Sequence, residues 1–132
     1  MITEKIHIDE QLCAVIISVV EPVAITEFYT DPDLLLQVGQ IAINSKRSIQ
    51  RHRHNLVERR TFGTSEVLLI LQGSLEMELF GQYDFVQEKR TLSKGQVVIL
   101  CGGGHAFKSR DDCVVLEIKN GPFMLENDKE YF

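Results

Sequence analysis

Apolar and polar residues along this chain follow the short alternating pattern of β-strands. Short runs rich in Val, Ile, Leu and Phe are separated by Gly, Asp, Asn, Ser or Lys, about ten residues apart. The predicted strands span residues 5–9, 12–19, 35–44, 49–54, 66–72, 74–80, 84–91, 96–101, 105–109 and 114–119. Their regular spacing predicts an all-β fold, either a sandwich or a barrel.

Two of these runs, residues 67–71 and 97–101, are apolar at every position. A strand with only one face in the core alternates with polar residues, so these two strands must be covered on both faces. We expect a second subunit to supply the cover, which favours a homodimer. The alternative is a cover from the same chain by residues 6–8 and 12–19.

Gly73 separates two runs in which the apolar residues change phase. If Glu66 points inward, strict alternation would also bury Glu76 and Glu78, yet Leu75 and Met77 belong to the apolar set of the second run. A glycine permits the bulge or tight bend that such a change of phase requires. We therefore predict that the two strands meet at a bend at Gly73.

Turn-forming residues mark three connections. Residues 31–33 (Asp-Pro-Asp) predict a turn or a short helical turn, residues 81–84 a hairpin turn between two strands, and residues 94–95 (Lys-Gly) a further turn.

Length and composition are those of one ordinary domain, residues 1–132. The chain is 44% hydrophobic and 25% charged, with a net charge of −5. A nucleic-acid-binding domain usually carries a basic excess, so none is expected as a partner. The first residues lack the basic-then-apolar pattern of a secretion signal, and the apolar runs are too short to span a bilayer. We expect a cytoplasmic protein without a membrane partner.

Cys13, Cys101 and Cys113 are odd in number and lack the CxxC spacing of metal or redox sites. All three lie in or beside apolar strand-like runs. We interpret them as buried, inert thiols of a reduced compartment.

Three of the four histidines and one glutamate form the most specific chemical pattern. His52 and His54 are two residues apart, so on a strand their imidazoles project to the same side. Glu66 begins an apolar run, and His105 follows three glycines. Imidazole and carboxylate are ligands of divalent transition metals, so these four residues predict a metal site. An exposed histidine pair and a turn histidine are the alternative; His7 is given no role.

These residues resemble the two motifs of the cupin superfamily. The first motif has paired histidines, then a glutamate and, after six intervening residues, a glycine; His52, His54, Glu66 and Gly73 resemble it. The second motif resembles residues 95–109, with His105 as its histidine. Three departures occur there: Cys101 replaces a proline, the glycine-to-histidine spacing is one residue short, and Ser109 replaces an asparagine.

The resemblance implies a double-stranded β-helix, the jelly-roll barrel of cupins. Residues 1–44 would cover the barrel or form the dimer interface, and residues 120–132 would be a C-terminal tail. One divalent transition metal (Fe, Mn, Ni, Zn or Cu) would be held by His52, His54, Glu66 and His105.

The carboxylate ligand has two candidates. Family spacing places a glutamate three or four residues after the second histidine, which fits Glu58, whereas Glu66 fits the strand start and the downstream glycine. We prefer Glu66, because residues 57–64 resemble an inserted loop.

Three further residues are candidates for contact with a substrate. Gln50 is two residues before His52, so on a strand its side chain would project to the same side. Gln72 occupies an alternating position on its own strand that would also let it line the pocket. Arg59, in the inserted loop, is able to clamp a phosphate or carboxylate, although a solvated charged loop is the simpler interpretation. Arg51 and Arg53 alternate with the histidines and should point away from them.

Three functions fit these residues. The first is a metal-dependent enzyme acting on a small polar molecule, either a sugar or sugar-phosphate isomerase or an Fe(II)-dependent dioxygenase. The second is a metal-free isomerase or epimerase of nucleotide-linked sugars, with a histidine as acid or base. The third is a non-enzymatic protein that binds a small molecule without converting it.

Overall fold

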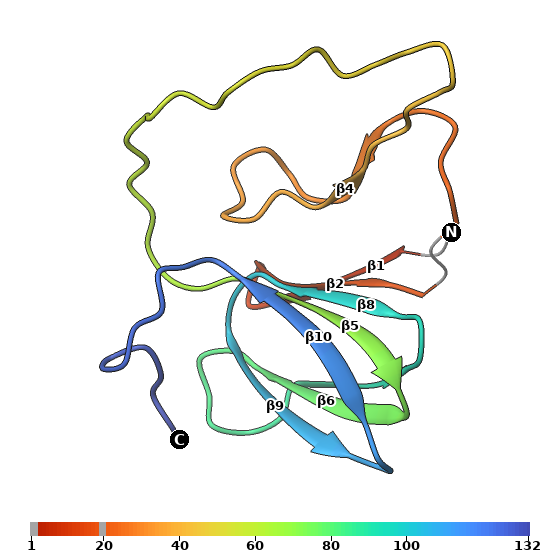
Figure 1. Ribbon diagram of the computed structural model, residues 1–132. Helices are drawn as coiled ribbons and strands as arrows, with labels where there is room; N and C mark the ends of the chain where they lie inside the picture. Colours follow the sequence, from red (N-terminus) through yellow and green to blue (C-terminus); the bar gives the residue numbers. More distant parts are fainter. Residues whose placement is uncertain (1–2, 19–20) are drawn as a thin grey trace.

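The protein is all-β in the computed structural model, which describes residues 3–18 and 21–132 (Figure 1). The strands are β1 (Thr3–Ile8), β2 (Gln11–Ile17), β3 (Glu27–Phe28), β4 (Gly39–Gln40), β5 (Glu66–Gln72), β6 (Ser74–Phe80), β7 (Glu88–Ser93), β8 (Val97–Leu100), β9 (Gly104–Ser109) and β10 (Val114–Lys119). The described residues contain no helix, and therefore none that is able to cross a membrane. The all-β prediction is confirmed.

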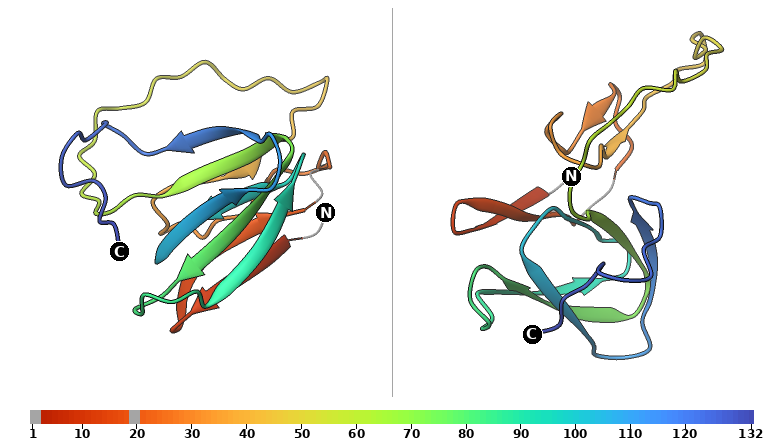
Figure 2. Two further views of the ribbon diagram at one scale, coloured as in Figure 1. Left: turned by 90° about the horizontal axis from the view of Figure 1, so that it is seen from below. Right: turned by 90° about the vertical axis from the view of Figure 1, so that its left-hand side faces the viewer.

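Two antiparallel sheets enclose the main core (Figures 1 and 2). One sheet has the strand order β1-β2-β8-β5-β10, and the other has the order β7-β6-β9. Ile16, Ile70 and Val98 of the first sheet join Met77 and Leu79 of the second in one buried cluster. Each side chain is at most 3% exposed, so the core excludes water.

The bend predicted at Gly73 is confirmed. On β5 the residues facing the core are Leu68 and Ile70, at even positions, whereas on β6 they are Met77 and Leu79, at odd positions. Gly73 lies between the two strands with φ +74°, a left-handed backbone conformation that side chains with a Cβ disfavour. The chain passes there from the five-stranded to the three-stranded sheet.

The outer face of the five-stranded sheet is covered from within the chain over β2, β8 and β5. Val15, Val67 and Ile99 form a second buried cluster, against which Leu36 and Val38 pack. The cover therefore comes from the segment 29–38. The segments 6–8 and 12–19 were the expected intrachain cover, but β1 and β2 are neighbours of β8 and β5 in the same sheet. Val19 lies outside the described residues.

Predicted and observed strands agree best along the core. β5, β6 and β10 have the predicted bounds, and β1, β2, β8 and β9 differ by one or two residues at their ends within the described chain. β7 begins four residues later than predicted, at Glu88. The prediction for residues 49–54 is wrong, because this segment forms no strand, and residues 35–44 contain only β4.

The predicted turns are present. Leu34 N donates a hydrogen bond to Asp31 O at 3.0 Å, which closes a turn around Pro32. β6 and β7 form an antiparallel hairpin across residues 81–87, and residues 94–95 form the turn before β8.

Candidate functional site

Glu66 and His105 lie side by side at one end of the molecule. Glu66 begins β5, between Leu100 of β8 and Lys119 of β10, and His105 lies on β9 opposite Leu79 of β6. Both face inward, because Glu66 has the parity of buried Leu68, and His105 pairs with buried Leu79. His105 Nε2 lies 3.3 Å from Glu66 Oε2. The fold thus joins a carboxylate of one sheet to an imidazole of the other.

The environment of Glu66 favours its ionised form. The residue is only 8% exposed, and such burial by itself would raise the pKa of the carboxyl group. The hydrogen bond with His105 outweighs burial and lowers the pKa of Glu66 below its ordinary value of 4.5. The charges of His105, Lys119 and Lys129 act in the same direction. The site therefore holds a partly buried carboxylate that is charged at neutral pH.

A cavity of about 530 Å³ opens onto this pair. Its walls combine the start of β5, the Gly-rich entry to β9 and the C-terminal residues: Gly63, Thr64, Glu66, Phe80, Gly103, Gly104, His105, Ala106, Asp128, Lys129, Glu130, Tyr131 and Phe132. The rings of Phe80 and Phe132 meet edge to face, with centroids 5.1 Å apart. The volume is suited to a small molecule, and the wall offers charges of both signs.

The glycines before His105 let the tail approach this wall. Gly103 has φ +69°, and a Cβ built on Gly104 would lie 2.8 Å from the Phe132 ring. A larger residue at Gly104 would therefore displace Phe132. The sequence contained no local signal that the tail lines this cavity, because the contact joins two segments distant in the chain.

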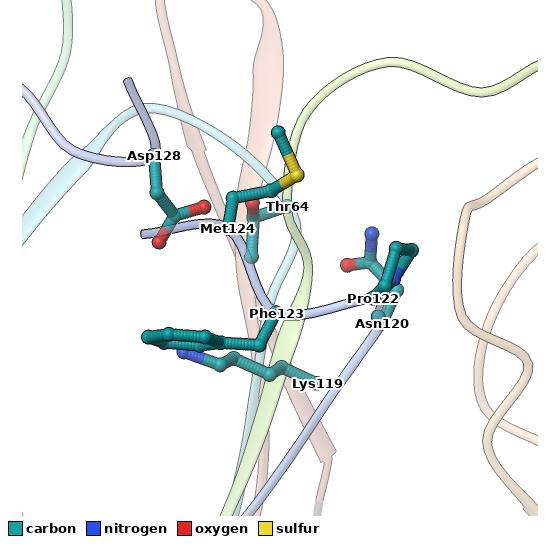
Figure 3. Close-up of a pocket in the computed structure, with 8 residues that line it drawn as sticks. Thr64, Lys119, Asn120, Pro122, Phe123, Met124 and Asp128 are labelled. Atoms are coloured by element: carbon teal, nitrogen blue, oxygen red, sulfur yellow. The ribbon is translucent and has the colours of Figure 1, made fainter. Parts of the chain in front are cut away.

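A smaller cavity of about 220 Å³ lies next to the first, and the two share Thr64 and Asp128 (Figure 3). In Figure 3 the aliphatic chain of Lys119 runs alongside the ring of Phe123, with Nζ 6.0 Å from the ring centroid. This contact fixes the beginning of the tail against the end of β10.

His52 and His54 lie apart from Glu66 and His105. Both are exposed, on the strand-free chain between β4 and β5 that runs clear of the two sheets (Figures 1 and 2). Their rings lie edge to face with centroids 5.3 Å apart, although the strand on which the prediction of a shared side depended is not formed. Within residues 3–18 and 21–132 no group of three or more metal-ligating side chains forms. The structure therefore unites two of the four predicted ligands.

The other candidate residues also lie away from the cavity wall. Glu58 is exposed and pairs with Arg60 at 2.8 Å, so Glu66 is the glutamate beside His105. Gln50 and Arg59 are exposed on the same strand-free segment as His52. Gln72 lies at the far end of β5, where its side-chain amide donates to Asp112 O at 3.3 Å.

The three cysteines are free thiols that are buried or half-buried. Burial raises the pKa of Cys13 and Cys101, which keeps both thiols protonated and unreactive at neutral pH. This agrees with the interpretation of these residues as inert parts of the apolar structure.

Comparison of the chain with protein-family models, curated proteins and solved structures found no match to any of the three.

Proposed function

We propose that the protein binds a small polar molecule in the cavity beside Glu66 and His105. The observation that carries the proposal is the Glu66–His105 pair itself, a charged carboxylate and an imidazole 3.3 Å apart in the wall of a cavity of about 530 Å³. Polar groups converging on a cavity of this size are typical of ligand sites. The cupin resemblance and the double-stranded β-helix belong to the same proposal, supported by two facing antiparallel sheets.

The pair is suited to proton transfer. A carboxylate that accepts a hydrogen bond from one imidazole nitrogen orients the ring and leaves the second nitrogen to exchange a proton with a ligand. Isomerisation or epimerisation of a sugar, sugar phosphate or nucleotide sugar needs such a transfer next to a carbonyl group. We therefore propose an isomerase or epimerase in which His105 is the acid or base and Glu66 holds it.

A divalent metal is the second element of the proposal. Carboxylate and imidazole are suitable ligands for Fe, Mn, Ni, Zn or Cu, but a stable centre needs more than the two groups united here. In their exposed positions His52 and His54 do not fit such a centre. The chemistry above therefore uses no metal, and metal-dependent isomerisation or oxygenation would require His52 and His54 to move to the pair.

Ligand binding is tested by a thermal-shift and NMR screen of sugar phosphates and nucleotide sugars. For any compound that binds, His105→Gln and Glu66→Gln should weaken binding at least about tenfold, since each removes a charged or hydrogen-bonding partner. His7→Gln, an exposed histidine on β1, is the matched control and should bind as the unchanged protein does.

Three results would count against parts of this proposal. If the His105→Gln protein bound the compound with the same affinity as the unchanged protein, the compound would bind outside this cavity. Binding without product would identify a non-enzymatic binder. Tag-free protein with less than about a tenth of an ion per chain, and no uptake of added divalent metal, would exclude a resident metal.

A further inference from the structure

The segment between β4 and β5 is an extended arm that makes no hydrogen bond to the rest of the chain within residues 3–18 and 21–132. We define the arm as residues 43–62. Each hydrogen bond that it makes within this part of the chain joins two residues of the arm itself, such as His52 Nδ1 to Gln50 O at 2.8 Å. Figures 1 and 2 show it running clear of both sheets. Its backbone is extended and unpaired, as in a strand that lacks a partner.

The arm exposes several large apolar side chains. It carries five large hydrophobic side chains that are more than half exposed: Ile43, Ile49, Leu56, Val57 and Phe62. Exposed apolar side chains concentrated in one projecting segment are typical of a surface that is covered in the functional state.

In the described residues the two larger sheets have four open edges, at β1 and β10 of one sheet and at β7 and β9 of the other. β9 and β10 follow each other along the chain, and each has a hydrogen-bonded neighbour on one side only. β10 is also bare on its outer face, where Leu116 and Ile118 are 48% and 55% exposed. These residues pair with Leu69 and Val67, so they continue the apolar face that the segment 29–38 covers elsewhere. Open apolar edges of this kind readily pair with another strand.

The charges of the arm and of the remaining chain are opposite. The arm contains six of the 14 basic residues and one of the 19 acidic residues, so its net charge is +5. The chain as a whole has a net charge of −5, which leaves −10 on the rest of the molecule. Along β9, β10 and their connection, Asp111, Asp112 and Glu117 are balanced by Lys108, Arg110 and Lys119, so the acidic excess lies elsewhere on the rest of the molecule. A basic arm and an acidic second copy attract each other.

We propose that two copies of the chain exchange their arms, each arm adding a strand to the open edges of the second copy. Each copy supplies one arm and one pair of edges, so the exchange closes with two-fold symmetry and leaves no arm free. At the β5 end the chain is tied to the end of β10, since Ser65 N donates to Asn120 Oδ1 at 2.9 Å and Asn120 Nδ2 donates to Gly63 O at 3.2 Å. Beyond this tie the arm runs clear of its own sheets (Figures 1 and 2), which leaves it free to pair with a second copy.

The exchange has a consequence for the site, which rests on the proposed function. His52 and His54 share one side of the arm. Paired with β9 of the second copy, that side would face the cavity that contains His105. The complete ligand set would then be formed only in the dimer, which explains why one chain alone unites only two of the four residues. The exchange itself does not depend on ligand or metal.

The dimer is tested by sedimentation of the unchanged protein and of three matched variants. Ile49→Asp on the arm and Ile118→Asp on β10 alter side chains that are 58% and 55% exposed in one chain, so neither should unfold it. Each should raise the dimer Kd at least about 100-fold, because burying a charge in place of isoleucine acts twice in a symmetric dimer. Ile25→Asp, at an 81% exposed position outside the arm, should leave the dimer unchanged.

Arm exchange is distinguished from other dimers by lysine cross-linking of a mixture of light and isotopically heavy protein. Lys46 lies on the arm, Lys108 on β9 and Lys119 on β10. Light-to-heavy links from Lys46 to Lys108 or Lys119 are expected. A monomer at tens of micromolar, equal effects of all three substitutions, or links only within one chain would overturn the proposal. Failure of ligand binding would leave these readouts untouched.

Discussion

At the scale of single residues, Glu66 shows how the fold keeps a charge near its core. An ionised carboxylate that is 8% exposed requires a partner, and His105 supplies it. Glu58 needs no such support, because it is exposed and its ion pair with Arg60 lies in water. The two glutamates were competing candidates from the sequence, and only Glu66 has the surroundings of a functional group.

His105→Gln should raise the pKa of Glu66 toward 4.5, because the hydrogen bond to His105 is the largest cause of its depression. In the unchanged protein the lowered pKa of Glu66 adds to the free energy of unfolding. This contribution is complete above pH 4.5 and is lost as the pH falls through the lower pKa of Glu66 in the folded state. The variant should lose about 1 kcal/mol at neutral pH. NMR titration of the carboxyl carbon and urea unfolding at several pH values measure both effects, with His7→Gln as the control. An unchanged pKa of Glu66 would show that His105 does not hold the carboxylate.

At the scale of elements, the β5–β6 connection transfers the chain from one sheet to the other. Gly73 has φ +74°, and a Cβ added there would collide with the backbone oxygen of Asp112. Asp111 closes the same bend, since its Oδ1 accepts a hydrogen bond from Ser74 N at 2.7 Å. The change of phase between β5 and β6 therefore depends on one residue without a side chain.

Gly73→Ala should destabilise the protein more than Gly95→Ala. Gly95 has a similar φ of +88°, but a Cβ there has no neighbour within 4 Å. The control variant, Gly95→Ala, should lose about 1–2 kcal/mol of unfolding free energy, because alanine is strained in a left-handed conformation. Gly73→Ala should lose at least about 1 kcal/mol more, because the bend must also move away from Asp112. Urea unfolding measures both; equal losses would show that the close approach at Gly73 contributes nothing.

At the scale of the whole molecule, charge is divided between the arm and the two sheets. A net charge of −5 conceals an arm of +5 on a remainder of −10. The value for the whole chain argued against a general nucleic-acid partner but gave no sign of this division. Opposite charges on two parts of one chain promote pairing between copies.

The proposed dimer should therefore weaken with salt. Between about 0.05 and 0.5 M NaCl the Debye length falls to a few ångströms, and the dimer Kd should rise at least about tenfold. Sedimentation at several salt concentrations measures the change, and urea unfolding of Ile49→Asp protein serves as the control for the fold itself. A dimer that becomes tighter with salt would show that apolar contacts alone hold it.

The sequence predicted the elements whose signal is local. Alternation located β5, β6 and β10 to the residue, and the phase change at Gly73 is a property of neighbouring residues. The same alternation failed at residues 49–54, where the residues are strand-like but no edge lies beside them. A strand needs a partner to satisfy its backbone, and periodicity does not show whether one is present.

The sequence by itself determined the all-β class, the turns and the burial of the cysteines in or beside apolar strands. Tertiary structure alone decided that Glu66 meets His105, that the C-terminal tail lines their cavity, and that residues 29–38 cover the outer face of β2, β8 and β5. The reason is physical: these contacts join segments far apart in the chain, and their geometry depends on sheet order and register. The local alternation of apolar and polar residues contains no information about sheet order or register between distant strands.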